Sequence, residues 1–247
     1  MESFENAIEV RHLRKVFGTL KAIDGIEFEL KQGEFLTVFG PNGAGKTTLI
    51  KILSGLTRPS SGTARVAGFD VSEGHPDMRK EIGVISHVTA LYADLTSFEN
   101  LIFFARMHGL EKPEDKVLKV IEEVGLSYRR NDRVRTFSRG MLQRLSIARA
   151  VLHDPAILFL DEPFTGLDLH ATNVLKEHLQ RLHDRRRTIL MTTHDISCGL
   201  EMCDKVALQV QGNFTFLENI VDIDKDRFES MYFDAVRDKQ FAMGIGL

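Results

Sequence analysis

The sequence has few cysteines, little net charge and no long hydrophobic run. Its 247 residues include two cysteines, Cys198 and Cys203, too few for a disulfide framework or a four-cysteine zinc site, which fits a reducing compartment. The 32 basic and 35 acidic residues give a formal net charge of -3, so we expect no general nucleic-acid-binding surface. No stretch reaches the roughly 18 apolar residues of a membrane-spanning helix, and the acidic N-terminus does not resemble a secretory signal. If the protein acts at a membrane, we expect another subunit to span it.

A glycine-rich segment lies between a strand pattern and a helix pattern. Residues 40–48 read Gly-Pro-Asn-Gly-Ala-Gly-Lys-Thr-Thr and follow the apolar run of residues 34–39. The glycines let backbone N–H groups approach anionic oxygens, and the next helix adds the positive end of its dipole. We expect Lys46 to reach the β- and γ-phosphates, Thr47 to ligate Mg²⁺ and Thr48 to contact the α/β region. The predicted nucleotide contacts are Gly40, Pro41, Asn42, Gly43, Ala44, Gly45, Lys46, Thr47 and Thr48.

Strand and helix patterns alternate along the chain, which predicts an α/β fold with a mostly parallel sheet. We expect residues 1–91 to form the N-terminal part of a nucleotide-binding core, including an antiparallel β layer. Residues 92–151 have helical patterns, with a helix capped by Ser97, and predict an inserted subdomain. Residues 152–220 then complete the core and end in a hairpin turning at Gly212-Asn213, and residues 221–247 form a tail.

Two adjacent acids, Asp161 and Glu162, follow the apolar strand pattern of residues 157–160. Ligands of open α/β sheets bind at the carboxyl ends of the strands. We therefore expect Asp161 to hold the Mg²⁺ shell and Glu162 to polarise the water that attacks the γ-phosphate. Two solvated acids at a strand end are the alternative, which the upstream phosphate loop disfavours.

Residues 137–150 resemble the signature segment of ATP-binding cassette (ABC) proteins. They read Phe-Ser-Arg-Gly-Met-Leu-Gln-Arg-Leu-Ser-Ile-Ala-Arg-Ala. Ser138 and Gly140 match the family's Leu-Ser-Gly-Gly-Gln, whereas Phe137, Arg139 and Met141 depart from it. The resemblance implies a P-loop NTPase fold of the ABC ATPase type. It also implies that Ser138 and Gly140 contact the γ-phosphate of ATP bound by a partner subunit.

The resemblance assigns four further residues. Phe17 lies where the family stacks an aromatic ring on adenine, with core packing as the alternative. Asp168 resembles the acid of the loop that crosses the dimer interface, and a helix N-cap is a compatible role. His194 matches the switch histidine between the γ-phosphate and the catalytic acid, with a structural histidine as the alternative. His87 replaces the usual catalytic glutamine, so we expect hydrolysis to fall at mildly acidic pH more steeply than in His87→Gln.

Residues 85–101 and 134–145 also resemble the ATP-binding subunit of the haem exporter of cytochrome c-type biogenesis. Together these resemblances imply an ATP-hydrolysing subunit of an ABC transporter. It would form a homodimer, or pair with another cassette, around two ATP-Mg²⁺ and drive an integral membrane subunit from the cytoplasmic face of the cell membrane. An exporter of another cargo is an alternative.

A soluble ABC-type clamp acting in translation or DNA repair is a further alternative. It is disfavoured because the chain has neither a second cassette nor a long coiled coil between phosphate loop and signature. A P-loop kinase is disfavoured by the signature segment and by Glu162 beside Asp161.

Overall fold

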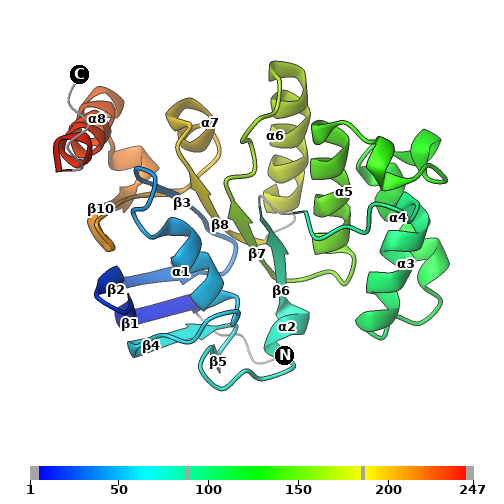
Figure 1. Ribbon diagram of the computed structural model, residues 1–247, viewed down its shortest axis with the longest axis horizontal. Helices are drawn as coiled ribbons and strands as arrows, with labels where there is room; N and C mark the ends of the chain where they lie inside the picture. Colours follow the sequence, from blue (N-terminus) through cyan, green and yellow to red (C-terminus); the bar gives the residue numbers. More distant parts are fainter. Residues whose placement is uncertain (1–5, 87–88, 185–186, 243–247) are drawn as a thin grey trace.

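A six-stranded, mostly parallel sheet forms the centre of the protein (Figure 1). The computed structural model describes residues 6–86, 89–184 and 187–242, with side chains to Arg237, and orders the strands β10-β9-β3-β8-β7-β6. Its three central strands are buried at every position, as is typical of parallel strands covered on both faces. The strands are β3 (Phe35–Phe39), β6 (Ile82–Ile85), β7 (Ile157–Asp161), β8 (Thr188–Thr193), β9 (Lys205–Val210) and β10 (Asn213–Asn219).

Parallel pairing brings the ends of the three central strands to one edge of this sheet. Phe39 of β3 pairs with Thr193 of β8, and Thr192 pairs with Asp161 of β7. The loop between β3 and helix α1 (Lys46–Leu53) starts at the same edge. Segments more than a hundred residues apart in the sequence therefore meet at the place where such sheets bind ligands.

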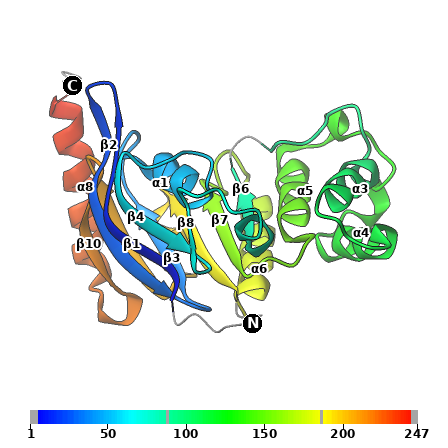
Figure 2. The ribbon, with the colours of Figure 1, turned by 90° about the horizontal axis from the view of Figure 1, so that it is seen from below.

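A second, four-stranded antiparallel sheet lies against the first, and it confirms the predicted N-terminal β layer. Its order is β2-β1-β4-β5. Apolar side chains of β1, β2 and β4 share one core with α1 and with the inner face of β3 and β7. Figure 2 shows both sheets at one end of the molecule and a group of helices at the other. The strands are β1 (Asn6–Phe17), β2 (Leu20–Lys31), β4 (Ser61–Val66) and β5 (Phe69–Asp70).

Helices α3 (Ser97–Met107), α4 (Pro113–Glu123) and α5 (Arg139–Val151) form that group. The prediction that Ser97 caps the first of them is wrong. Thr96 is the N-cap, because its hydroxyl accepts from Glu99 N while the Glu99 carboxylate accepts from Thr96 N, a complete capping box. Ser97 is instead fully buried.

The helices that follow β7 share one apolar core with Phe35 and Phe39 of β3, on the face of the sheet opposite to α1. The predicted terminal hairpin is confirmed, but its turn lies one residue earlier than expected, at Gln211 and Gly212, which have φ of 48° and 83°. Two positive φ values in a two-residue loop suit the right-handed twist of the hairpin.

No helix of the described residues has the length and apolar character to cross a bilayer. The remaining helices are α2 (Met78–Glu81), α6 (Leu169–Asp184), α7 (Ile196–Leu200) and α8 (Lys225–Ala242), with 3-10 turns at Ser127–Arg129, Val134–Thr136 and Ile220–Asp222.

Candidate functional site

The loop of residues 40–45 is closely surrounded by backbone from two other strands. A Cβ on Gly40 would lie 2.2 Å from the carbonyl oxygen of Gln209, and one on Gly45 would lie 2.2 Å from that of Ala22. Gly45 also has φ of 106°, a value that residues with a Cβ rarely adopt. The loop is further tied to β9 because the Gln209 side chain donates to the Ala44 carbonyl at 3.1 Å. These contacts require glycine at positions 40 and 45 of the predicted phosphate loop.

Lys46 lies inside this loop. Its side chain is buried, and Nζ donates to the Gly40 carbonyl at 2.6 Å. The same ammonium lies 3.4 Å from Oε1 of Glu162. A buried cation in contact with a carboxylate at the start of a helix is suited to binding the terminal phosphates of a nucleotide.

Asp161 joins the phosphate loop to the neighbouring strand. It is 2% exposed, and its Oδ1 accepts hydrogen bonds from Thr47 Oγ1 at 3.1 Å and from Thr192 Oγ1 at 2.8 Å. The predicted pair Thr47 and Asp161 is thus in direct contact. Hydroxyl and carboxylate oxygens are the ligands that Mg²⁺ prefers, so this donor set fits a small divalent cation.

Glu162 and His194 form a second contact at the same edge. His194 Nδ1 lies 2.7 Å from Oε2 of Glu162, and the other oxygen of this carboxylate, Oε1, faces Lys46. Glu162 has φ of 52°, an uncommon conformation for a residue with a side chain, and its N–H donates to the Thr192 carbonyl at 3.0 Å. Left-handed non-glycine residues cluster at functional sites. Lys46, Glu162 and His194 therefore form a continuous polar group.

The predicted signature residues lie in another place. Ser138 is the N-cap of α5, and its Oγ accepts from Met141 N at 3.3 Å. Ser138 and Gly140 line a cavity of about 220 Å³ together with Asp168 and other residues of the 166–174 segment, and no residue of the 40–48 loop is among its walls. The Arg139 guanidinium fills the space next to Gly166, where a Cβ would lie 2.5 Å from Cζ.

Three other predicted residues have different outcomes. Phe17 is half exposed with the Lys15 ammonium 4.9 Å from its ring centre, so the core-packing alternative is wrong. Asp168 accepts from Ala171 N at 2.7 Å and does serve as a helix cap. His87 lies outside the described residues, and its pH dependence stays a prediction.

Two residues of this edge were not predicted. Thr192 holds Asp161 and lies at the end of an apolar run, where a hydroxyl was the available signal. Tyr232 belongs to the segment expected only as a tail, and its hydroxyl donates to the His194 carbonyl at 3.4 Å. Burial, and next the negative charge of Glu162, raise the pKa of Tyr232, so the phenol keeps its proton.

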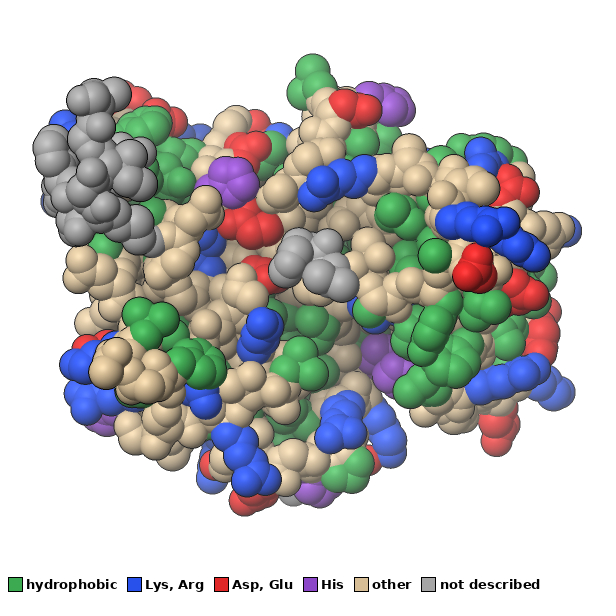
Figure 3. Space-filling model, in the orientation of Figure 1, with side chains coloured by type: hydrophobic (Ala, Val, Ile, Leu, Met, Phe, Trp, Pro, Cys, Tyr) green, Lys and Arg blue, Asp and Glu red, His purple; other side chains and the backbone are tan. Residues whose placement is uncertain are grey.

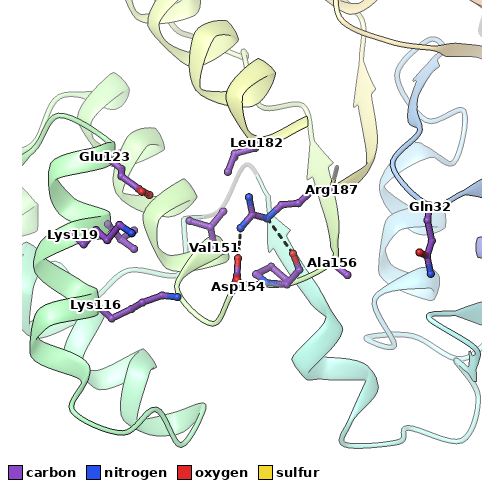
Figure 4. A pocket seen from close by; sticks show the side chains of 11 residues that line it. Gln32, Lys116, Lys119, Glu123, Val151, Asp154, Ala156, Leu182 and Arg187 are labelled. Atoms are coloured by element: carbon purple, nitrogen blue, oxygen red, sulfur yellow. Dashed lines mark hydrogen bonds and ion pairs between the residues drawn. The ribbon is translucent and has the colours of Figure 1, made fainter. Parts of the chain in front are cut away.

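A larger cavity, of about 530 Å³, is lined by side chains that include those of α4 and of the segment between α5 and β7 (Figure 4). It is bordered by Lys116 and Lys119 of α4 and by Arg187, which forms an ion pair with Asp154 and donates to the Pro155 carbonyl at 3.1 Å. Its walls include none of the predicted nucleotide contacts. The candidate site is therefore the polar group at the sheet edge and not this larger cavity.

The chain matches the model of the family described as ABC transporter over residues 23–165. It is 34% identical over 218 residues to the linearmycin resistance ATP-binding protein LnrL of Bacillus subtilis (strain 168), covering 87% of this chain and 70% of LnrL. It is 36% identical over 203 residues to the Nod factor export ATP-binding protein I of Cupriavidus metallidurans, covering 81% of this chain and 67% of that protein.

Solved structures are similar over most of the chain. An ATP-binding subunit of an ABC transporter has a TM-score of 0.83 and 27% identity, covering 93% of this chain and 99% of its own. A dimeric ATP-binding cassette in a post-hydrolysis state, bound to ADP and Pi, has a TM-score of 0.77 and 25% identity, covering 86% of this chain and 98% of its own.

Proposed function

Because this chain belongs to the ABC transporter family as an ATP-binding subunit, we propose that it forms a dimer around two ATP-Mg²⁺ and drives a separate transmembrane subunit. The chain is an ABC-type ATPase that binds and hydrolyses ATP. The observation that carries the dimer proposal is the separation of two groups of residues. Lys46, Glu162 and His194 are in contact at the sheet edge, whereas Ser138 and Gly140 line another cavity.

Each residue at the sheet edge has a role in the proposed mechanism. Lys46 binds the β- and γ-phosphates inside the loop, and Glu162 takes up a proton from the attacking water. His194 orients the Glu162 carboxylate through the 2.7 Å contact. Thr47 and Asp161 would hold Mg²⁺, which neutralises charge on the phosphate oxygens. Thr192 supports this pair because its hydroxyl holds Oδ1 of Asp161 at 2.8 Å.

The second subunit would complete the site. We propose that Ser138 and Gly140, at the N-terminus of α5, contact the γ-phosphate bound by the partner, since N-terminal amides and the helix dipole favour anions. The likeness to a dimeric cassette bound to ADP and Pi supports this arrangement. An isolated monomer would then hydrolyse ATP slowly.

An exposed aromatic area on the helical group supports a protein partner. Tyr92 and Phe103 are 50% and 40% exposed with ring centres 5.2 Å apart, and Met107 is 69% exposed. Figure 3 shows hydrophobic side chains gathered over these helices. Such contiguous apolar surface is typical of an interaction site. We propose that the transmembrane subunit contacts the chain here, which would place the chain on the cytoplasmic face of the cell membrane.

We propose that the transporter that this chain drives exports its cargo. The names of two relatives refer to linearmycin resistance and to Nod factor export. These names favour an exporter of a cargo other than haem, although residues 85–101 and 134–145 resemble the haem exporter. Loss of c-type cytochromes in cells lacking the chain would restore the haem hypothesis. Purification from native membranes should recover an integral subunit, whereas recovery with ribosomes or DNA and no membrane protein would contradict the transport proposal.

The Glu162→Gln variant tests the divided site. It should form an ATP-dependent dimer in size-exclusion chromatography with light scattering, while hydrolysis falls by at least about 100-fold because the base is lost. Glu177→Gln, at an exposed acid of α6, is the matched control and should behave as the wild type. A Glu162→Gln protein that stays monomeric with ATP and still hydrolyses it would overturn the proposal.

A further inference from the structure

The C-terminal helix α8 is anchored on the strand that leads into the phosphate loop. Phe228 is 1% exposed, and its ring centre lies 5.2 Å from that of Phe39 and 5.6 Å from that of Phe216. Phe39 is the last residue of β3, directly before the loop. Figure 1 shows α8 beside β10 at the edge of the sheet. Burial of Phe228 therefore ties α8 to the nucleotide site.

One helical turn later, α8 reaches the segment that carries the histidine. Tyr232 follows Phe228 by four residues, which places both side chains on one face of the helix. Tyr232 is 8% exposed, and its hydroxyl donates to the His194 carbonyl at 3.4 Å. The distance is long for a hydroxyl donor, so this hydrogen bond is a weak one. The donor contacts the backbone of the residue whose imidazole meets Glu162.

The helix that follows His194 packs against the same phenylalanine as α8. A Cβ on Gly199 of α7 would lie 2.4 Å from Cζ of Phe39, so α7 packs directly on this ring. Asp195 caps α7 by accepting from Cys198 N at 2.9 Å. His194 is thus the junction between a rigid strand and a capped helix. The carbonyl and the imidazole of His194 branch from the same Cα, so a donor held on the carbonyl restrains the backbone from which the imidazole projects toward Glu162.

We propose that Tyr232 is a positioning residue for hydrolysis: through the His194 carbonyl it holds the imidazole against Glu162, which makes α8 part of the catalytic apparatus. This inference rests on the roles proposed above for Glu162 and His194. Helix α8 lies outside the range of residues 23–165 that the family model matches. Tyr232 acts on orientation, so its loss affects turnover and leaves the phosphate loop able to bind ATP.

The test compares Tyr232→Phe, which removes only the hydroxyl, with the wild-type full chain. We expect kcat to fall roughly two- to five-fold, the effect of one weak hydrogen bond, with KM for ATP unchanged and the thermal midpoint lowered by no more than about 4 °C. Tyr128→Phe removes an exposed hydroxyl elsewhere and is the matched control. In the His194→Ala background, single-turnover hydrolysis should be the same with Tyr or Phe at position 232.

Nitrogen-15 spectra of the histidines give a second readout. The His194 ring signals should shift or broaden in Tyr232→Phe, while those of His153 stay in place. Wild-type kcat in Tyr232→Phe, or an equal loss of kcat in the His194→Ala background, would overturn the inference. If Glu162→Gln forms the ATP-dependent dimer, such a result rejects the role of Tyr232 alone. If Glu162→Gln fails, the proposed function itself is wrong.

Discussion

Replacing His153 by asparagine should remove about 1 kcal/mol of the stability that the fold loses between pH 7 and pH 5. His153 follows α5, its Nε2 lies 2.9 Å from the Ile82 carbonyl oxygen, and its ring stacks on that of His108 with centres 3.9 Å apart and planes at 5°. Burial, and next the charge of His108, lower the pKa of His153 from 6.5 to about 4. The Ile82 carbonyl and Asp154 oppose this shift, and Lys116 adds to it. The pair lies between the helical group and β6.

The direction of the pH effect follows from the pKa of His153 in the folded and in the unfolded chain. The pKa of His153 is lower in the folded chain than in the unfolded chain, so the unfolded chain binds the proton more readily. The contribution of His153 to the free energy of unfolding is therefore fully present above pH 6.5 and is lost as the pH falls toward 4. The full difference between 6.5 and about 4 corresponds to about 3–4 kcal/mol. Because the ring is only partly buried, we expect about 1 kcal/mol to be lost between pH 7 and pH 5 through this residue.

Urea unfolding followed by circular dichroism at pH 7, 6 and 5 measures this term. The free energy of unfolding of wild type should fall by about 1 kcal/mol more over this range than that of His153→Asn, even though the variant is less stable at pH 7 without its contacts. His170→Asn, at an exposed position of α6, is the control and should keep the wild-type slope. Equal slopes for wild type and His153→Asn would refute the reasoning.

Two further substitutions probe the phosphate loop and the signature. Gly45→Ala should lower the free energy of unfolding by about 2–4 kcal/mol, because its Cβ would meet the Ala22 carbonyl at 2.2 Å, whereas Gly18→Ala has nothing within 4 Å and serves as the control. Chemical unfolding measures both, and equal losses would contradict the packing argument. Ser138→Ala should cost about 1 kcal/mol by removing the N-cap of α5 and should weaken the ATP-dependent dimer of Glu162→Gln, while Ser138→Thr retains both. Unchanged thermal unfolding in Ser138→Ala would show that the cap is dispensable.

Errors in the predicted elements came from adjacent residues of similar chemistry. Thr96 and Ser97 both carry a hydroxyl that can cap a helix, and only the reciprocal bonds with Glu99 distinguish them. Similarly, Gly212 and Asn213 both favour turns, but the register of β9 with β10 places the turn at Gln211 and Gly212. Local propensity identifies such boundaries to within one or two residues, because neighbouring positions compete for the same role.

Short contiguous patterns by themselves determined that this chain binds a nucleotide in an α/β fold. The strand, glycine loop and helix around Lys46 are local, and their chemistry follows from residues side by side in the chain. Only the tertiary structure decided which distant groups meet. Thr192 holds Asp161 because β8 lies next to β7, and Tyr232 reaches His194 because Phe228 anchors α8 on Phe39. Strand order and helix docking depend on packing of the whole core, which no local pattern encodes.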